Sequence, residues 1–205
     1  LIIGEEYNRR LVGKNGLRMF NIMRKSDATV RAALQIVKLP IQGLENDIKP
    51  ALADDAAEVE RAEFIESQLF NNPNFDFDAI RREALTFLDF GHSVAEITFG
   101  LVDFNGKPMI GITDLSFRKQ DSILKWETAD GRPGITQLLP VSVDGKNQAD
   151  IIREHKLLFV NDQEGENFEG VSLLRYAYKD WDMKDKLGMV YAIGLEKMAI
   201  PTPLL

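Results

Sequence analysis

The chain has 205 residues, a net charge of −7 at pH 7, 44% hydrophobic and 28% charged residues, and no cysteine. This length is enough for one large domain or two small ones with a buried core. The missing cysteines exclude disulfides and thiolate metal sites. The acidic balance argues against tight binding of DNA phosphates, which requires clustered Lys and Arg, but allows loose passage of DNA past an acidic wall.

The sequence predicts neither a membrane-spanning helix nor a signal peptide. No stretch approaches the roughly 18 consecutive apolar residues that a membrane-spanning helix needs. The opening residues Leu1–Gly4 are too short for a signal-peptide core, and acidic Glu5 and Glu6 follow them. Because the chain lacks an initial methionine and stops at Leu205 without a polar tail, we expect it to be a piece of a longer product.

The first ninety residues are expected to be mainly helical. In the basic segment 8–25, Gly13 and Gly16 predict a turn or loop. Asp27 is an expected N-cap for a helix with an apolar face that Pro40 ends, followed by extended pieces at 41–43 and 48–50. A second helix is predicted from Asp54-Asp55 to about Asn71. A third is predicted from a cap at Asp76 or Asp78 to Gly91. The expected apolar face of the first helix consists of Val30, Ala33, Leu34 and Val37.

After Gly91 the hydrophobic period changes to that of strands. A strand is predicted from residue 94 to 104, and Asn105-Gly106 predicts a tight hairpin turn with the return strand at 109–112. Two further strands, 122–127 and 135–139, flank a turn cluster at 130–134. Another short strand is predicted at 157–160, followed by an acidic loop at 161–169.

A long helix is predicted over residues 171–198. Its aromatic residues have helical spacing, which favours packing in a core or a subunit interface over stacking on nucleic acid. The fold class is therefore α+β, with residues 1–90 mainly helical, 91–160 mainly strands of a meandering antiparallel sheet, and the long helix last. The aromatic residues are Tyr176, Tyr178, Trp181 and Tyr191.

Several short patterns suggest chemistry, but each has a structural explanation. Asp89-Phe90-Gly91 spells a kinase tripeptide, yet the other kinase motifs are absent, so it indicates a helix end turning into a strand. Gly100 and Gly106-Lys107 do not have phosphate-loop spacing. His92 and His155 have no metal-ligand spacing. We assign no catalytic, cofactor-binding or metal-binding residue. The acidic residues that could together hold calcium, Asp162, Glu164, Glu166 and Glu169, lack EF-hand spacing.

A succession of short sequence motifs over about residues 19–203 resembles the motifs of bacteriophage portal proteins, in their Mu-like branch. The resemblance departs from the family at Phe168 or Glu169, where proline is frequent, and at Ala199-Ile200-Pro201, where the family has Gly-x-Pro-like phrases. The motifs, in chain order, are 19–39 with the following 40–51, Phe87–Ile97, Leu115–Gln120, Lys125–Glu127, His155–Val160 and Phe168–Arg175, and then Trp181, Lys184 and Glu196.

The resemblance implies a non-enzymatic ring of identical subunits, usually twelve, at one vertex of the virion capsid, assembled in the host cytoplasm. Double-stranded DNA would pass through its channel without sequence specificity. The partners would be the major capsid protein, a terminase, and tail or adaptor proteins, with no membrane and no cofactor. The chain would be one wing-like region, with the stem and clip after Leu205, so no DNA-contacting residue can be named.

A ring also needs two different complementary faces on each subunit. Basic residues at 9–31, including Arg24, Lys25 and Arg31, and acidic residues at 45–66 could supply them. Two other classes remain open. A hydrolase or nucleotide-dependent enzyme would have a pocket with convergent polar groups and shifted pKa values. A capsid or tail adaptor would be shorter and more helical.

Overall fold

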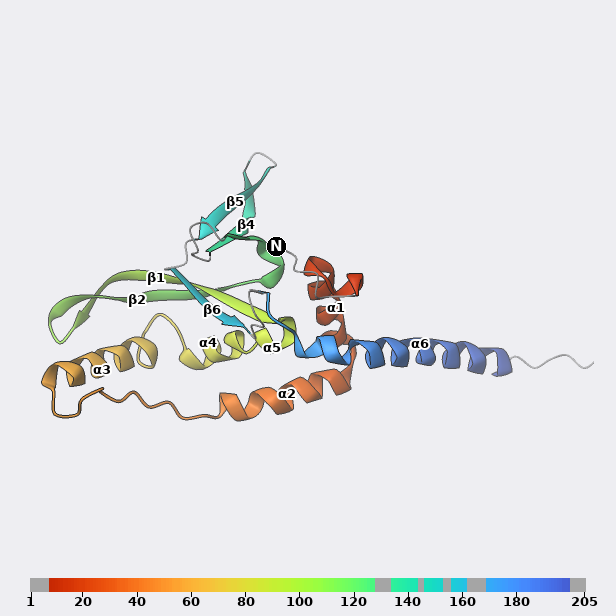
Figure 1. The fold of residues 1–205 in the computed structure, drawn as a ribbon, viewed down its shortest axis with the longest axis horizontal. Coiled ribbons are helices and arrows are strands. Elements are labelled where there is room, and N and C mark those ends of the chain that lie inside the picture. The colour runs from red at the N-terminus through yellow and green to blue at the C-terminus, as the bar shows by residue number, and fades with distance from the viewer. Residues whose placement is uncertain (1–7, 128–133, 144–145, 153–155, 162–168, 200–205) are drawn as a thin grey trace, which may run out of the picture.

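The computed structural model describes residues 8–127, 134–143, 146–152, 156–161 and 169–199, and confirms the α+β class. Helices come first, antiparallel strands follow, and a long helix projects from the body (Figure 1). The helices are η1 Arg9–Leu11, α1 Gly13–Ser26, α2 Ala28–Gln42, α3 Ala56–Leu69, α4 Phe77–Ala84, α5 Phe87–Phe90, η2 Gln120–Ser122 and α6 Leu173–Ala199. The strands are β1 His92–Phe104, β2 Lys107–Arg118, β3 Ile123–Glu127, β4 Gly134–Val143, β5 Lys146–Ile152 and β6 Leu157–Asn161.

Aspartate caps start three of the N-terminal helices. Asp27 Oδ1 accepts from the amide of Thr29 at 2.8 Å, Asp55 Oδ1 from Ala57 at 2.9 Å, and Asp76 Oδ1 from Asp78 at 3.0 Å. Each bond satisfies an amide that has no partner within the first helical turn. The predicted start of α2 is confirmed, and Asp76 is the cap of α4 while Asp78 lies inside it.

The prediction of a turn or loop in the basic segment is wrong, because α1 occupies most of it. Gly13 takes a positive φ of 52° at the first residue of the helix. A Cβ at Gly16 would lie 2.2 Å from the carbonyl oxygen of Leu11, so this glycine lets η1 fold back against the helix. Gly16, Phe20 and Met23 are all buried. Their i, i+4, i+7 spacing is the helical signal that the two glycines obscured.

The prediction that Pro40 ends the helix capped by Asp27 is also wrong. α2 continues to Gln42, so residues 41–42 are helical rather than extended, and 44–50 has no regular structure. Proline in a final turn removes only one backbone donor. The last turn of the helix, which follows Pro40, is closed by the amide of Gly43, which donates to the carbonyl of Leu39 at 3.0 Å. The helix also buries Lys38 with Leu34, while Val37 of the expected apolar face is 44% exposed.

The predicted third helix is divided into α4 and α5 by Leu85 and Thr86. Gly91 ends α5 with a φ of 94°, as the sequence predicts. A Cβ at this position would lie 2.5 Å from the carbonyl oxygen of Glu169. Gly91 is therefore required twice, for its backbone conformation and for the close passage of the chain that leads into α6.

The predicted hairpin is confirmed, and its strands are longer than the sequence indicated. Asn105 and Gly106 both have positive φ, 53° and 76°, between β1 and β2. A register shift after Thr98 interrupts the ladder. Next to it, Gln68 of α3 accepts from the amide of Ile112 at 3.0 Å, and Asn72, just after α3, donates to the carbonyl of Ile112 at 2.8 Å. α3 thus supports the sheet at its irregular point.

The antiparallel strands divide between two sheets, with orders β2-β1-β6 and β3-β4-β5. β6 returns to pair with β1 along residues 92–96, so the strands do not follow a single meander. The predicted strands at 122–127, 135–139 and 157–160 correspond to β3, β4 and β6. β5 was not singled out by the sequence, because its polar residues give little alternation.

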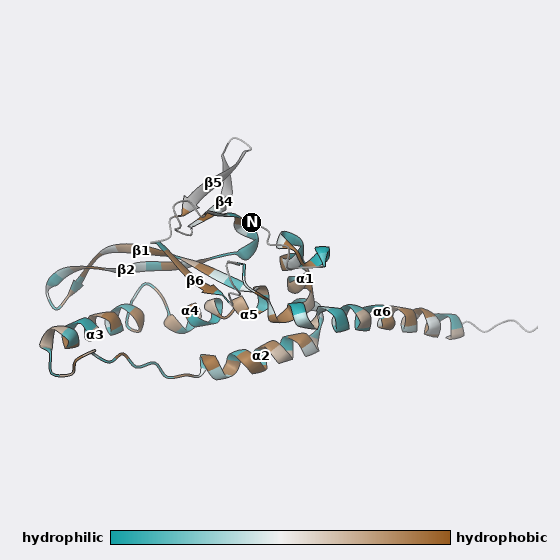
Figure 2. Ribbon diagram, viewed as in Figure 1, coloured by the Kyte–Doolittle hydropathy of each residue, from teal (hydrophilic) through white to brown (hydrophobic). Residues whose placement is uncertain are grey.

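Two hydrophobic clusters hold these elements together. The first joins α1, α2 and the start of α6 around fully buried Met23, and the second joins β1 to the sheet β3-β4-β5 around Val94 and Ile135. Figure 2 shows that hydrophobic residues also continue along α6 beyond this core. The first cluster consists of Phe20, Met23, Leu34, Leu174 and Tyr178, and the second of Val94, Ile123, Ile135 and Ile152.

α6 has a packed first half and an unpartnered second half. Lys184 donates to the second carboxylate oxygen of Asp27 at 2.6 Å, which lowers the pKa of Asp27 and fastens α6 to the start of α2. From Met183 to Met198 every residue except Gly194 is exposed. In the described part of the chain, no helix is long and apolar enough to cross a membrane.

Candidate functional site

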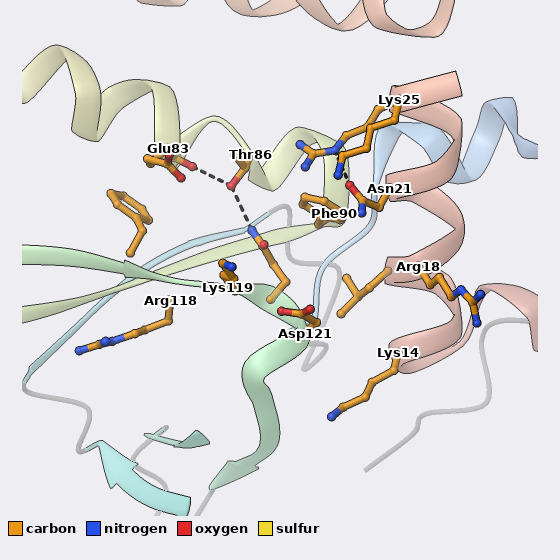
Figure 3. A pocket seen from close by; sticks show the side chains of 14 residues that line it. Lys14, Arg18, Asn21, Lys25, Glu83, Thr86, Phe90, Arg118, Lys119 and Asp121 are labelled. Carbon is orange, nitrogen blue, oxygen red and sulfur yellow. Dashed lines mark hydrogen bonds between the residues drawn. The ribbon is translucent and has the colours of Figure 1, made fainter. Parts of the chain in front are cut away.

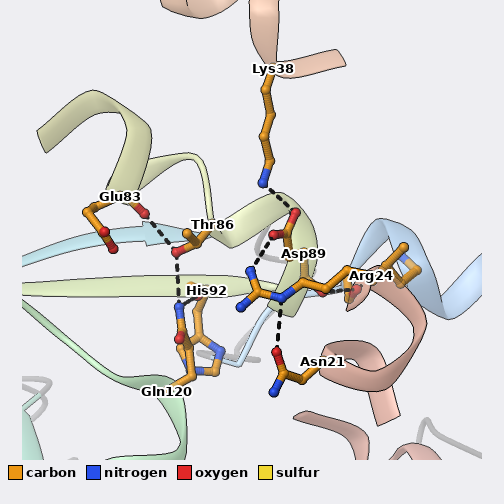
Figure 4. Close-up of polar contacts among 10 residues, drawn as sticks. Asn21, Arg24, Lys38, Glu83, Thr86, Asp89, His92 and Gln120 are labelled. Atoms are coloured by element: carbon orange, nitrogen blue, oxygen red, sulfur yellow. Dashed lines mark hydrogen bonds and ion pairs between the residues drawn. The ribbon is translucent and has the colours of Figure 1, made fainter. Parts of the chain in front are cut away.

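A buried carboxylate lies where α1, α2 and α5 meet. Asp89 of α5 has a side chain only 3% exposed, with Lys38 Nζ at 2.6 Å from Oδ1 and Arg24 Nη1 at 3.0 Å from Oδ2 (Figure 4). Lys38 is itself 10% exposed. Two cations on one carboxylate leave a net positive charge at the junction, and they fix the two first helices to the end of α5.

Arg24 is oriented by three groups at once. Besides Asp89, its Nε donates to Asn21 Oδ1 at 3.1 Å, and its guanidinium carbon lies 4.6 Å from the ring centre of Phe90. Two nitrogens of this planar group, Nε and Nη1, therefore have hydrogen-bond partners within the chain. The expectation that Arg24 belongs to a free basic face is corrected by these contacts, whereas Lys25 and Arg31 are exposed.

The same junction fixes the start of α6. The hydroxyl of buried Ser172 donates to the backbone carbonyl of Asp89 at 2.6 Å and accepts from the amide of Leu174 at 3.0 Å. One side chain thus caps the long helix and ties it to α5. Asp89-Phe90-Gly91 is therefore a helix end turning into a strand, as the sequence indicated. Its carboxylate joins α1, α2 and α5, and the backbone carbonyl of Asp89 holds the start of α6.

A pocket opens beside this junction, between α1 and the end of β2. Its volume is about 520 Å³, and Figure 3 shows α1 on one side of it and Arg118, Lys119 and Asp121 on the other. Leu17, Phe90 and Phe117 contribute apolar surface. Its charged lining residues are the basic Lys14, Arg18, Arg24, Lys25, Arg118 and Lys119 and the acidic Glu83 and Asp121.

The positive charge of this pocket is only partly neutralised by the chain. Arg24 pairs with Asp89, and Arg118 pairs with Glu96 across the β1–β2 ladder. Within the described residues, the other four cations of the lining have no carboxylate within ion-pair distance. In a chain of net charge −7, such a cluster is a local patch of positive charge that attracts anions. The four cations are Lys14, Arg18, Lys25 and Lys119, and all are exposed.

His92 lies at the first residue of β1 and is 4% exposed. Its Nδ1 donates to the backbone carbonyl of Glu169 at 3.0 Å, and its ring meets the edge of Trp126 with centroids 5.2 Å apart. Burial lowers the pKa of His92. The histidine therefore packs as a neutral ring between β1, β3 and the approach to α6, and it does not line the basic pocket.

The aromatic residues of α6 divide into two groups. Tyr178 is buried and Trp181 packs beside it, as expected for core residues. Tyr176 and Tyr191 are 64% and 69% exposed, so they are not core residues. Exposed aromatic rings among apolar neighbours are typical of surfaces that bind a partner.

Two groups named from the sequence fall partly or wholly outside the described residues. His155 and the acidic residues at 162–168 are outside them, and Glu169 contributes its carbonyl to His92. Among the residues that the structure describes, no group of three or more His, Asp or Glu side chains could hold a metal ion.

Sequence reasoning located the basic segment but neither the pocket nor the buried carboxylate. Arg24 and Asp89 are 65 positions apart, and no local spacing connects them. The sequence did contain one signal for the buried carboxylate: Lys38 lies in a predicted helix next to residues whose apolar pattern indicated burial. A buried lysine requires a carboxylate partner, and Asp89 is that partner.

Fold and site together define a structural building block: a helix-and-sheet body with a basic pocket on one flank and a long helix that presents unpartnered apolar residues. The family model described as portal protein of Mu bacteriophage matches residues 17–205. The chain belongs to this family of bacteriophage portal proteins, as the order of its sequence motifs indicated. No curated protein matches the chain.

Proposed function

We propose that the chain is a structural subunit of a portal ring at the unique vertex of a bacteriophage capsid, through which DNA is packaged and ejected. The observation that carries this proposal is the family match over residues 17–205, nearly the whole chain. In this proposal, identical copies, about twelve, form a closed ring, because cyclic symmetry lets one pair of complementary faces repeat around an axis.

The second half of α6 supports assembly of this kind. Leu187, Val190 and Tyr191 are 63%, 68% and 69% exposed, and further apolar residues surround them. A contiguous apolar surface of this kind marks a protein interface, since it costs free energy in water. The apolar residues exposed on this half of the helix are Met183, Leu187, Met189, Val190, Tyr191, Ile193, Leu195 and Met198.

The proposal places the chain in the wing-like region of the subunit, with α6 leading toward a stem. The stem and clip would supply the surfaces that line the channel. Partners would be the major capsid protein, a terminase during packaging, and tail or adaptor proteins afterwards, in a particle assembled in the host cytoplasm. Net charge −7 fits passage of double-stranded DNA without sequence-specific binding, since like charge prevents adhesion.

The alternative of a hydrolase or nucleotide-dependent enzyme draws less support. It predicts a pocket in which polar groups with shifted pKa values converge. The basic pocket is lined mainly by exposed cations. The groups with shifted pKa that the structure describes, Arg10, Asp27 and His92, lie outside it.

Electron microscopy of the full-length protein tests the proposal. A closed ring with a central hole is the expected result, and its rotational symmetry gives the subunit number. A protein that stays monomeric at every concentration examined would contradict it. Turnover of a nucleotide or ester by that monomer would favour the enzyme.

A further inference from the structure

The lining of the basic pocket has more cations than carboxylates, six against two. Lys14 and Lys25 reach it from α1, and Lys119 from the end of β2 (Figure 3). An excess of like charge on one surface attracts a partner of opposite charge. No carboxylate of the described chain pairs with these three exposed lysines, so all three can meet carboxylates of another molecule.

The acidic segment 45–66 is the matching surface on the same chain. Asp54, Glu63 and Glu66 are exposed and form no ion pair within the described residues. Leu52 and Ile65 beside them are 63% and 46% exposed, so the segment also presents apolar side chains. Its acidic residues are Glu45, Asp47, Asp54, Asp55, Glu58, Glu60, Glu63 and Glu66, against only Lys49 and Arg61.

The two surfaces lie far apart on one molecule. In Figure 1, α3 and the acidic segment lie at one end of the body, near the turn of the β1–β2 hairpin. α1 lies toward the opposite end, beside the start of α6. One chain therefore cannot join its own two surfaces. Two copies can, and a head-to-tail contact between different faces is the type that closes into a ring.

We propose that the basic pocket binds the acidic segment around α3 of a second copy of this chain, and that this charged contact sets the register of neighbouring subunits. The inference rests on the proposed ring. Carboxylates of the partner copy would meet Lys14, Lys25 and Lys119, while Leu17 and Phe117 of the pocket offer apolar surface to the partner's Leu52 and Ile65. Complementary charge of this kind chooses orientation and excludes wrong pairings.

A charge swap in the full-length protein tests this contact. The first variant carries Lys14→Glu, Lys25→Glu and Lys119→Glu; the second carries Asp54→Lys, Glu63→Lys and Glu66→Lys. Each alone places like charges together, so we expect at least a tenfold loss of ring at low salt, measured as assembled mass by analytical ultracentrifugation. The third variant carries all six changes in one chain and restores opposite charges, so ring formation should return.

Circular dichroism and thermal unfolding check that each variant folds, which is expected because all six side chains are exposed. A matched control, Lys179→Glu with Asp180→Lys, changes exposed charges on α6 outside both surfaces.

The inference is overturned if either triple variant assembles like the wild type. It is also overturned if the variant with all six substitutions folds but does not regain ring formation. It is also overturned if the pocket variant keeps its ring but loses binding of a short duplex DNA probe, because the pocket then binds phosphate. Absence of a ring in the wild type overturns the proposed function itself, whereas intact rings in every variant overturn only this contact.

Discussion

At the scale of single residues, Asp89 is a buried carboxylate held by two cations. Replacing it in Asp89→Asn removes the charge that holds Lys38 and Arg24, and leaves a lysine that is only 10% exposed without a counter-ion. We expect the free energy of unfolding to fall by about 3–5 kcal/mol, the usual cost of breaking a buried ion pair. Urea denaturation followed by circular dichroism measures it.

Two controls separate this buried pair from a general effect of charge. Asp121→Asn removes an exposed carboxylate from the basic pocket and should change stability by less than about 0.5 kcal/mol. Lys38→Met combined with Asp89→Asn removes both members of the buried pair and should recover part of the loss. If Asp89→Asn were as stable as the wild type, the carboxylate would not fix the helices in the way described.

His92 makes stability depend on pH. Burial lowers its pKa in the folded chain below the ordinary value near 6.5, so the unfolded chain binds more protons between these two pKa values. The stabilising contribution is complete above about pH 7 and is lost as the pH falls below about 6.5. His92→Gln should remove this loss, seen in urea denaturation at pH 7.5 and 5.5, while His155→Gln serves as the matched control. A wild-type stability that rises on acidification over this range would contradict the assignment.

At the scale of elements, the end of α2 depends on an arginine from α4. Arg81 Nη1 donates to the carbonyls of Ile41, Gln42 and Leu44 at 3.3, 3.1 and 2.7 Å. The carbonyl of Ile41 also accepts from the backbone amides of Gly43 and Leu44 at the end of the helix. A cation at a helix C-terminus meets a favourable dipole. This contact helps the helix to continue past Pro40.

Arg81→Met keeps the aliphatic stem but removes these donors. We expect a destabilisation of about 1–3 kcal/mol, because the end of α2 would lose a charged donor whose side chain is only 13% exposed. Arg82→Met is the control, since that side chain is 59% exposed and lies 3.7 Å from Asp76, and it should cost less than about 0.5 kcal/mol. Thermal unfolding of both variants measures the difference. If Arg81→Met and Arg82→Met had equal melting temperatures, Arg81 would not cap α2.

The elements that the sequence predicted are those with local causes. Asp27 and Asp55 cap helices through amides two residues away, and Asn105-Gly106 forms a turn through its own backbone preference. α1 was missed because Gly16 is selected by the passage of Leu11, a contact that composition does not reveal. The basic pocket follows the same rule: charge enrichment indicated its α1 side, but Lys119 joins it only through the fold.

At the scale of the whole molecule, α6 is the element whose stability the described chain does not explain. Its second half buries no side chain against the body, and isolated helices of such length are marginal in water. Helix propensity alone therefore stabilises residues 185–198 only weakly, beyond the bond from Lys184 to Asp27. Packing against α6 helices of neighbouring copies would supply the missing burial.

This reasoning predicts a separation between folding and assembly. Leu187→Lys with Tyr191→Lys places two charges on the apolar surface, where they should weaken self-association at least tenfold, since each large apolar side chain contributes about 1.5–3 kcal/mol when buried. The body should keep its unfolding temperature, because both residues are exposed, by 63% and 69%. Asp185→Lys, on a different face of the same exposed half, controls for added charge. Assembled mass by ultracentrifugation gives the answer: if the double variant associates like the wild type, the apolar surface of α6 is not the interface between copies.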